Sequence, residues 1–204
     1  MFTARTLFEG KWVLLILAGL VVAGWSWHKP TALVPLVLLL FTLSFFRDPD
    51  RVVPADPKVI VAPADGRIVE VKPAGQGTMV AIFLSVFDVH VQRAPLAGTI
   101  RRVRYHPGKF LDARRAEATS QNENREVEIE AADGFRVTVR QIAGLIARRI
   151  VGWAGEGAPV QQGERIGMIR FGSRVELILP AEVEVVAQVG EYAKGGETVV
   201  ARRK

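Results

Sequence analysis

The sequence predicts a mainly β domain, either a barrel or a sandwich, that follows an N-terminal hydrophobic helical hairpin. Residues 12–27 and 31–46 contain no acidic or basic side chain, which is typical of membrane helices. From residue 58 onward, short apolar runs alternate with glycine and proline, as in a domain of many short strands. We therefore expect a membrane-associated segment over residues 1–50 and a soluble domain over residues 51–204.

The two apolar runs predict a membrane anchor. Each has 16 residues, or about 24 Å as a helix, against a hydrocarbon core of roughly 30 Å. A tight spanning hairpin and a pair of segments dipping into one leaflet both fit this length, and two buried core helices are the alternative. Arg5 and Lys11 precede the pair, and Arg47 and Arg51 follow it. The positive-inside tendency then predicts a protein of the cell membrane whose soluble domain lies on the cytoplasmic side.

The strand candidates of the soluble domain are bounded by turn residues. Ala-Asp-Gly at 64–66 and again at 132–134 supplies a glycine suited to positive φ. Residues 143–151 are the one helix candidate. The predicted strands are 58–63, 67–73, 78–85, 90–95, 98–106, 126–131, 135–142, 165–170, 174–180 and 182–187.

Two segments share a pattern of a valine, a turn of glycine and an acidic residue, and a return to apolar residues. These are 158–167 and 188–200. Biotinyl and lipoyl hammerhead barrels are punctuated in this way, so we expect a domain of that type. Their carrier function needs a lysine at a hairpin tip, usually beside methionine. Lys194 has no methionine beside it, which argues against a swinging-arm carrier.

Composition limits the chemistry. The chain has 27 basic and 21 acidic residues and a net charge of +6, which attracts anions such as nucleic acid, anionic lipid or a phosphorylated substrate. The absence of cysteine excludes disulfides, thiolate nucleophiles and thiolate metal sites. With three histidines, we expect no metal centre. No zinc-finger, helix-turn-helix or aromatic-basic RNA-binding pattern is visible, so we expect no nucleic acid partner.

Gly172-Ser173 begins a dense apolar strand, and this pair can carry an unusual reaction. The serine hydroxyl can attack the preceding carbonyl, because glycine lets the backbone strain and lets other groups approach. Elimination from the resulting ester would break the chain and leave a dehydroalanine. Its hydrolysis gives a pyruvoyl group, whose carbonyl can form a Schiff base with an amine. Taken alone, however, the dipeptide favours an ordinary turn.

Seven motifs in order raise the weight of this chemistry. With them the chain resembles phosphatidylserine decarboxylase proenzymes, in their short prokaryotic branch (type A). The motifs are FFRDPDR (45–51), PADGRI (63–68), FLSVFDVHVQRAPLAGTI (83–100), YHPGKF (105–110), NENRE (122–126), QIAGLIARRI (141–150) and FGSRVELILP (171–180).

The resemblance implies autocatalytic cleavage between Gly172 and Ser173. The zymogen would yield a large chain, 1–172, and a small chain, 173–204, which stay together as a heterodimer. Ser173 would become the pyruvoyl group, the enzyme's cofactor, with no metal and no pyridoxal phosphate. The resemblance also makes Ser173, His90 and Asp65 the catalytic set, with His90 as base and Asp65 as the residue that orients it.

One position departs from the longer branch of the family, which carries two histidines three residues apart. Here Arg93 stands at the second place. Either His90 serves both self-cleavage and later proton donation, or Arg93 binds a phosphate or carboxylate. Further substrate-binding candidates are His106, Lys109 and Arg125. Solvated or structural roles for these side chains remain the alternative.

The resemblance implies a lyase of phospholipid biosynthesis. Phosphatidylserine in the bilayer would lose CO₂ and become phosphatidylethanolamine. The arginine pairs at 101–102, 114–115 and 148–149 are expected to meet the anionic membrane surface. Homo-oligomers are possible. An archaetidylserine decarboxylase, acting on the same headgroup of an ether lipid, is one alternative. A non-catalytic membrane adaptor built on a biotinyl-type barrel is another, and it would give no chain cleavage.

Overall fold

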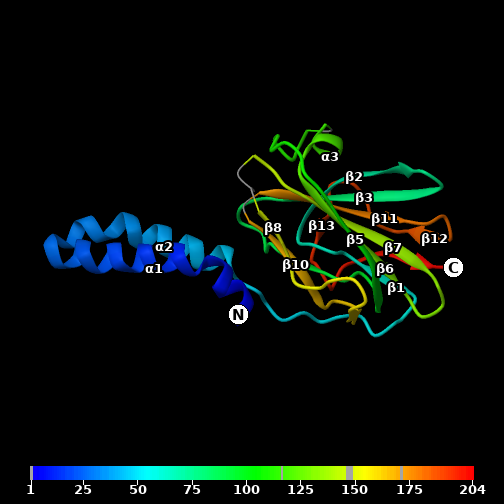
Figure 1. The fold of residues 1–204 in the computed structure, drawn as a ribbon, viewed down its shortest axis with the longest axis horizontal. Coiled ribbons are helices and arrows are strands. Elements are labelled where there is room, and N and C mark those ends of the chain that lie inside the picture. Colours follow the sequence, from blue (N-terminus) through cyan, green and yellow to red (C-terminus); the bar gives the residue numbers. More distant parts are fainter. Residues whose placement is uncertain (1, 116, 146–148, 171) are drawn as a thin grey trace. The chain divides into compact units, whose positions relative to one another are not determined.

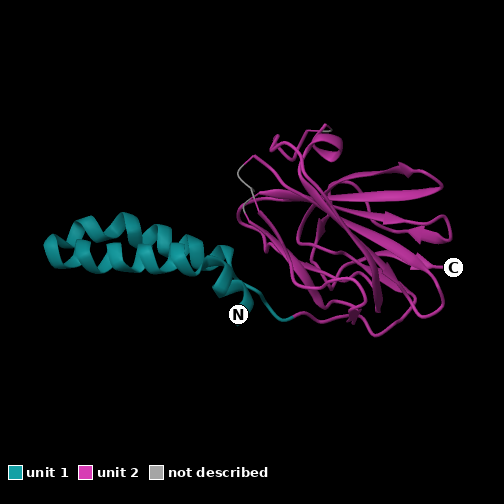
Figure 2. Cartoon of the chain, viewed as in Figure 1, with its two compact units in different colours: residues 1–50 teal, residues 51–204 magenta. Residues whose placement is uncertain are grey.

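The computed structural model describes residues 2–115, 117–145, 149–170 and 172–204. The chain divides into two compact units, residues 1–50 and 51–204 (Figure 2). The division falls in the segment between Pro49 and Pro54, where proline interrupts regular helix.

Unit 1 is helical. Helix α1 (Ala4–Trp27) begins with a capping box in which Thr3 and Thr6 satisfy each other's backbone N–H groups. A short 3₁₀ turn, η1 (Lys29–Ala32), leads into α2 (Leu33–Phe45). Within the described residues, α1 is the helix whose length and composition suffice to cross a membrane, and Lys29–Phe45 is a shorter apolar stretch. Both predicted apolar runs are therefore helical.

Unit 2 is mainly β, as predicted. Gly66 and Gly134 adopt φ of 145° and 85°, as the two Ala-Asp-Gly turns predicted. The elements of unit 2 are β1 (Val59–Val61), β2 (Gly66–Ala74), β3 (Gly77–Leu84), β4 (Val91–Arg93), β5 (Gly98–His106), α3 (Ala118–Gln121), β6 (Asn124–Glu130), β7 (Arg136–Ile142), β8 (Arg149–Gly152), β9 (Pro159–Val160), β10 (Arg165–Arg170), β11 (Ser173–Leu179), β12 (Val183–Val185), β13 (Tyr192–Ala193) and β14 (Val199–Arg203).

The described strands form one large sheet and two small ones (Figure 1). The large sheet is open and curled, with eight strands in the order β13-β2-β3-β11-β7-β6-β5-β9. The small sheets have the orders β1-β14-β12 and β4-β10-β8. The mainly β class is thus established, whereas the likeness to a biotinyl or lipoyl hammerhead stays a prediction.

The helix expected over residues 143–151 is wrong at its described end. Arg149–Gly152 forms β8, which pairs with β10 from Arg170 back to Gly167. A short apolar run fits a helix and a buried strand equally, so the partner strand decides. Residues 146–148 lie outside the described residues. The two-residue strands β9 and β13 and the four-residue α3 are too short to leave a sequence period.

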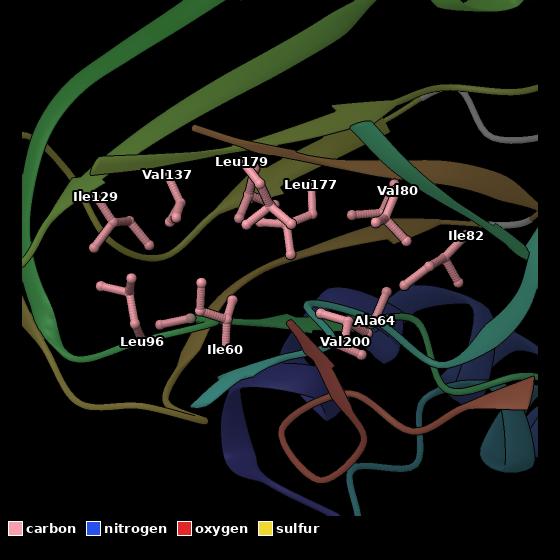
Figure 3. Packing of buried hydrophobic residues seen from close by; sticks show 14 of the residues in the cluster. Ile60, Ala64, Val80, Ile82, Leu96, Ile129, Val137, Leu177, Leu179 and Val200 are labelled. Atoms are coloured by element: carbon pink, nitrogen blue, oxygen red, sulfur yellow. The ribbon is translucent and has the colours of Figure 1, made fainter. Parts of the chain in front are cut away.

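The core lies between the large sheet and the two small sheets (Figure 3). Val80 and Ile82 of β3 and Leu177 of β11 face Ile60 of β1 and Val200 of β14, and all five are buried. Each such side chain contributes roughly 1.5–3 kcal/mol by leaving water. Strand β11 is thereby held between β3 and β7 at the centre of the sheet, and Ser173 is its first residue.

Candidate active site

Ser173 faces the interior of unit 2. Side chains alternate along a strand, and Val175 and Leu177, on the same face of β11 as Ser173, belong to the core. Ser173 pairs in register with Leu84 of β3 and has no exposed surface. Its Oγ makes no hydrogen bond to the described residues. A buried hydroxyl without a partner is costly, so this atom needs a functional explanation.

Gly172 stands before the strand with φ of 48°, a conformation that residues with a Cβ rarely adopt. Its carbonyl packs closely on Gly144, where an added Cβ would lie 2.2 Å from the Gly172 oxygen. Glycine at 144 therefore makes room for the carbonyl that the serine must attack. Sequence reasoning quoted this residue inside a motif and gave it no role, because nothing local distinguishes it.

His90 reaches the amide N–H of Gly172, on the peptide that precedes the Gly172–Ser173 bond, and it comes from the segment before β4 of a small sheet. Its Nε2 accepts a hydrogen bond of 3.2 Å from the Gly172 N–H. Its Nδ1 lies 2.9 Å from the carbonyl oxygen of Asp88, which can only accept, so Nδ1 carries the proton. These contacts describe a neutral imidazole whose unprotonated Nε2 lies beside the Gly172–Ser173 segment.

Asp88 is a second residue that sequence reasoning missed. One carboxylate oxygen accepts from the Ser85 N–H and the other from the Tyr192 hydroxyl, each at 2.7 Å. These bonds hold the turn whose carbonyl binds His90. Asp88 belongs to the same Asp-Val-His segment that drew attention to His90, and that was the available signal.

The carboxylate of Asp65 binds Arg51 and the backbone of Gly195. Both of its carboxylate oxygens lie 2.9 Å from Nη2 of Arg51, and one also accepts from the Gly195 N–H at 2.9 Å. Burial raises the pKa of Asp65, while Arg51 and the Gly195 N–H act in the opposite direction. Strand β3 lies between β2, which follows Asp65, and β11. An orienting role of Asp65 toward His90 stays a prediction.

Arg125 begins a buried chain of polar side chains that ends at His90. Its Nη1 donates to Oε1 of Gln141 at 2.8 Å, and Nε2 of Gln141 donates to Oε1 of Gln92 at 2.8 Å. Nε2 of Gln92 donates to the His90 carbonyl, also at 2.8 Å. Burial lowers the pKa of Arg125. These contacts connect Arg125 to the backbone that carries the base, and its binding of substrate stays a prediction.

The other three substrate-binding candidates lie on different elements. Arg93 is buried, and its Nη1 donates to the Gly163 carbonyl at 3.0 Å. Nε2 of His106 lies 3.7 Å from a carboxylate oxygen of Glu126, and the imidazole is half-exposed. Lys109 is exposed and donates to Gln121 at 3.0 Å. Their roles toward substrate stay predictions.

The outer face of β11 carries a group of ion pairs. Nε of Arg174 donates to Glu176 at 2.8 Å, and Nη1 of Arg140 donates to the other oxygen of Glu176 at 3.1 Å. Nη2 of Arg174 reaches Glu70 of β2 at 2.5 Å. Thr119 of α3 also donates to Glu176 at 2.7 Å. Charges paired this way hold the strand that begins with Ser173 to its neighbours on both sides.

A cavity of about 270 Å³ adjoins the Gly172 peptide. Its walls come from the end of β3 and from the loops that follow β3, β5 and β7. The described lining residues are Phe83, Ser85, Val86, Asp112, Ala113, Arg114, Leu145 and Gly172. None of Arg93, His106, Lys109 and Arg125 is among them.

Within the described residues, no group of three or more His, Asp or Glu side chains is arranged to hold a metal ion. The described residues instead bring the buried Ser173 hydroxyl and the neutral imidazole to either side of Gly172, whose carbonyl forms the peptide bond to Ser173.

Comparisons with known proteins identify the family of the chain. The family model of phosphatidylserine decarboxylase matches residues 38–201. The chain belongs to the phosphatidylserine decarboxylase family. It is therefore an enzyme that decarboxylates phosphatidylserine, and the adaptor alternative is excluded.

Its relatives cover nearly the whole chain. A phosphatidylserine decarboxylase proenzyme of Solibacter usitatus is 47% identical over 193 residues, which is 94% of this chain and 93% of the relative. The proenzyme of Oleidesulfovibrio alaskensis is 50% identical and covers 85% of this chain and 82% of its own length. The proenzyme of Geobacter sulfurreducens is 44% identical, over 89% of this chain and 88% of its own length. The resemblance drawn from the seven motifs is thus confirmed.

Proposed function

We propose that this decarboxylase cuts its own chain between Gly172 and Ser173 and turns Ser173 into the pyruvoyl group on which the reaction depends. The observation that carries the proposal is the buried Ser173 Oγ, which has no hydrogen-bond partner among the described residues, next to a positive-φ glycine. The word proenzyme in the relatives' names supports it.

The chain's own groups account for each bond. Ser173 Oγ attacks the Gly172 carbonyl carbon, the C–N bond breaks, and the hydroxyl proton passes through His90 to the released nitrogen. His90, neutral again after the first step, then takes the Cα proton of residue 173, and the bond from Cβ to Oγ breaks. This step frees the Gly172 carboxylate and leaves dehydroalanine. Water displaces its nitrogen as ammonia, and the pyruvoyl group remains at the front of 173–204.

His90 is the base of the self-cleavage. Its Nε2 is unprotonated and already lies at the Gly172 N–H, one residue from the attacking hydroxyl. The Ser173 hydroxyl has to take the place of the Gly172 N–H at Nε2 before it can give its proton to His90. The Asp88 carbonyl keeps Nδ1 protonated and thereby keeps Nε2 available. We assign the orientation of His90 to this carbonyl and a supporting role to Asp65.

The pyruvoyl group, once formed, supplies a carbonyl that condenses with the substrate amine and withdraws electrons as CO₂ leaves. His90 lies beside that carbonyl's position and returns the proton to the carbon. Arg93 donates a hydrogen bond to the Gly163 carbonyl, which is a structural contact. This contact supports the alternative in which His90 serves both self-cleavage and proton donation.

The membrane gives this enzyme its substrate. Helix α1 is long and apolar enough to span a bilayer, and the basic residues around the anchor favour the cytoplasmic side for unit 2. The lipid stays in the bilayer, and only its headgroup enters the site. An ether lipid with the same serine headgroup would react by the same steps, because it differs from phosphatidylserine only in the chains, which do not take part in the reaction.

The test is an intact-mass measurement on the parent and on Ser173→Ala, with Ser120→Ala as the control because Ser120 is an exposed serine. The parent and the control should give fragments 1–172 and 173–204, the smaller one without a free amino terminus, and should release CO₂. Ser173→Ala should give one uncut, inactive chain. A Ser173→Ala variant that still divides and still decarboxylates would disprove the proposal.

A further inference from the structure

The cavity beside Gly172 is a binding site without an assigned occupant. We propose that it receives the phosphoserine headgroup and that Arg114 binds the phosphodiester. This inference rests on the proposed function, because it places the substrate next to the atoms that Ser173 contributes. It names a contact that none of the four sequence-derived binding candidates provides.

The size of the cavity selects the headgroup. Pockets that enclose drug-sized ligands hold about 300–1,000 Å³. The cavity has about 270 Å³, which suits a serine and a phosphate but excludes two acyl chains. The chains therefore remain outside, at the rim. Leu145 of the lining is 61% exposed, and Phe87, next to Val86 of the lining, is 72% exposed. These apolar side chains can face the lipid.

Arg114 is the one cation among the described lining residues. Its guanidinium is held by Asp112 through Nε at 3.0 Å and 3.1 Å and through Nη2 at 2.5 Å. Those bonds use one edge of the planar group. The donors of Nη1 remain directed elsewhere, and a guanidinium suits a phosphate oxygen.

Asp112 keeps Arg114 ready for this role. The side-chain hydrogen bond from Arg114 lowers the pKa of Asp112 to about 2. The carboxylate is thus charged at every physiological pH and restrains the arginine before substrate arrives. A long side chain that is already restrained in the free enzyme loses less conformational entropy when the ligand binds. The pair lies at the surface, with the Arg114 side chain 72% exposed, and in this proposal it holds the guanidinium at the mouth of the cavity for a phosphate.

The experiment compares Arg114→Gln with Arg115→Gln in the full-length enzyme in detergent micelles. Arg115 is the matched control, because it is adjacent and exposed but does not line the cavity. After normal self-cleavage, Arg114→Gln should raise the KM for dihexanoylphosphatidylserine by roughly ten- to a hundredfold, the range for a hydrogen bond to a charged group. The kcat should change little, and Arg114→Lys should recover part of the loss.

A binding measurement separates this inference from the proposed function. Calorimetry of glycerophosphoethanolamine on the Ser173→Ala chain reports the phosphate contact without any chemistry. Affinity should fall by a similar factor when Arg114→Gln is added and should be unchanged with Arg115→Gln. Equal KM and equal affinity for the two glutamine variants would overturn the assignment. So would failure of Arg114→Gln to self-cleave, because Arg114 has no part in processing here.

Discussion

Gly144→Ala tests the geometry of self-cleavage most directly. The new Cβ would lie 2.2 Å from the Gly172 oxygen, whereas real Cβ contacts are essentially never shorter than 3.0 Å. The carbonyl under attack, or the segment after β7 that carries Gly144, must therefore move by at least about 0.8 Å. A misplacement of about 1 Å at a reacting group can cost roughly a hundredfold in rate. We expect self-cleavage to slow by that order, or about 2.7 kcal/mol of activation free energy.

The assay follows the appearance of fragment 173–204 on a denaturing gel after synthesis in a cell-free system. Gly155→Ala is the matched control, because nothing lies within 4 Å of its added Cβ and its φ is not positive. A melting curve of each variant separates slow processing from failure to fold. If Gly144→Ala folds and cleaves as fast as Gly155→Ala, the carbonyl contact does not govern the reaction.

Three further predictions concern the groups around the site. Gln141→Leu should lower the free energy of unfolding by about 1–3 kcal/mol for each polar partner left unsatisfied. It should also slow cleavage, because Gln141 links Arg125 to Gln92, which binds the His90 carbonyl. Urea unfolding and the gel assay check this, and an unchanged cleavage rate would contradict the positioning role. Glu176→Ala should destabilise the uncut chain by about 1–3 kcal/mol, because Arg174 loses this acceptor while it keeps Glu70; no measurable loss in denaturant unfolding would refute it. Arg114 lowers the pKa of Asp112 to about 2. The stabilisation from this pair is therefore present above pH 3.8, the ordinary pKa of an aspartate, and is lost as the pH falls through about 2. Titration of the Asp112 carboxyl carbon by NMR checks this, and a midpoint near 4 would contradict it.

Much of the fold followed from local patterns. A strand was predicted over residues 174–180, and β11 spans Ser173–Leu179. The pairing with β3 and β7 then shows that Ser173 and Val175 face the core, and Arg174 and Glu176 lie on the opposite face. The helix expected at 143–151 failed because a short apolar run does not distinguish a helix from a strand, and β10 supplied a partner for Arg149–Gly152. The roles of the catalytic set came from the resemblance and remain proposals.

The sequence by itself determined the two apolar N-terminal helices, the mainly β class, and the family and its activity. The helices and strands follow from local periodicity, and the family follows from several short motifs that occur in a fixed order along the chain. Only the tertiary structure decided which groups surround the Gly172–Ser173 peptide. His90 and Gly172 are 82 positions apart in the chain, and the Gly144 contact, the Gln92–Gln141–Arg125 chain and the Arg114 cavity likewise join distant segments. Such contacts form when separate strands pack around one core, and no local pattern encodes which side chains then meet.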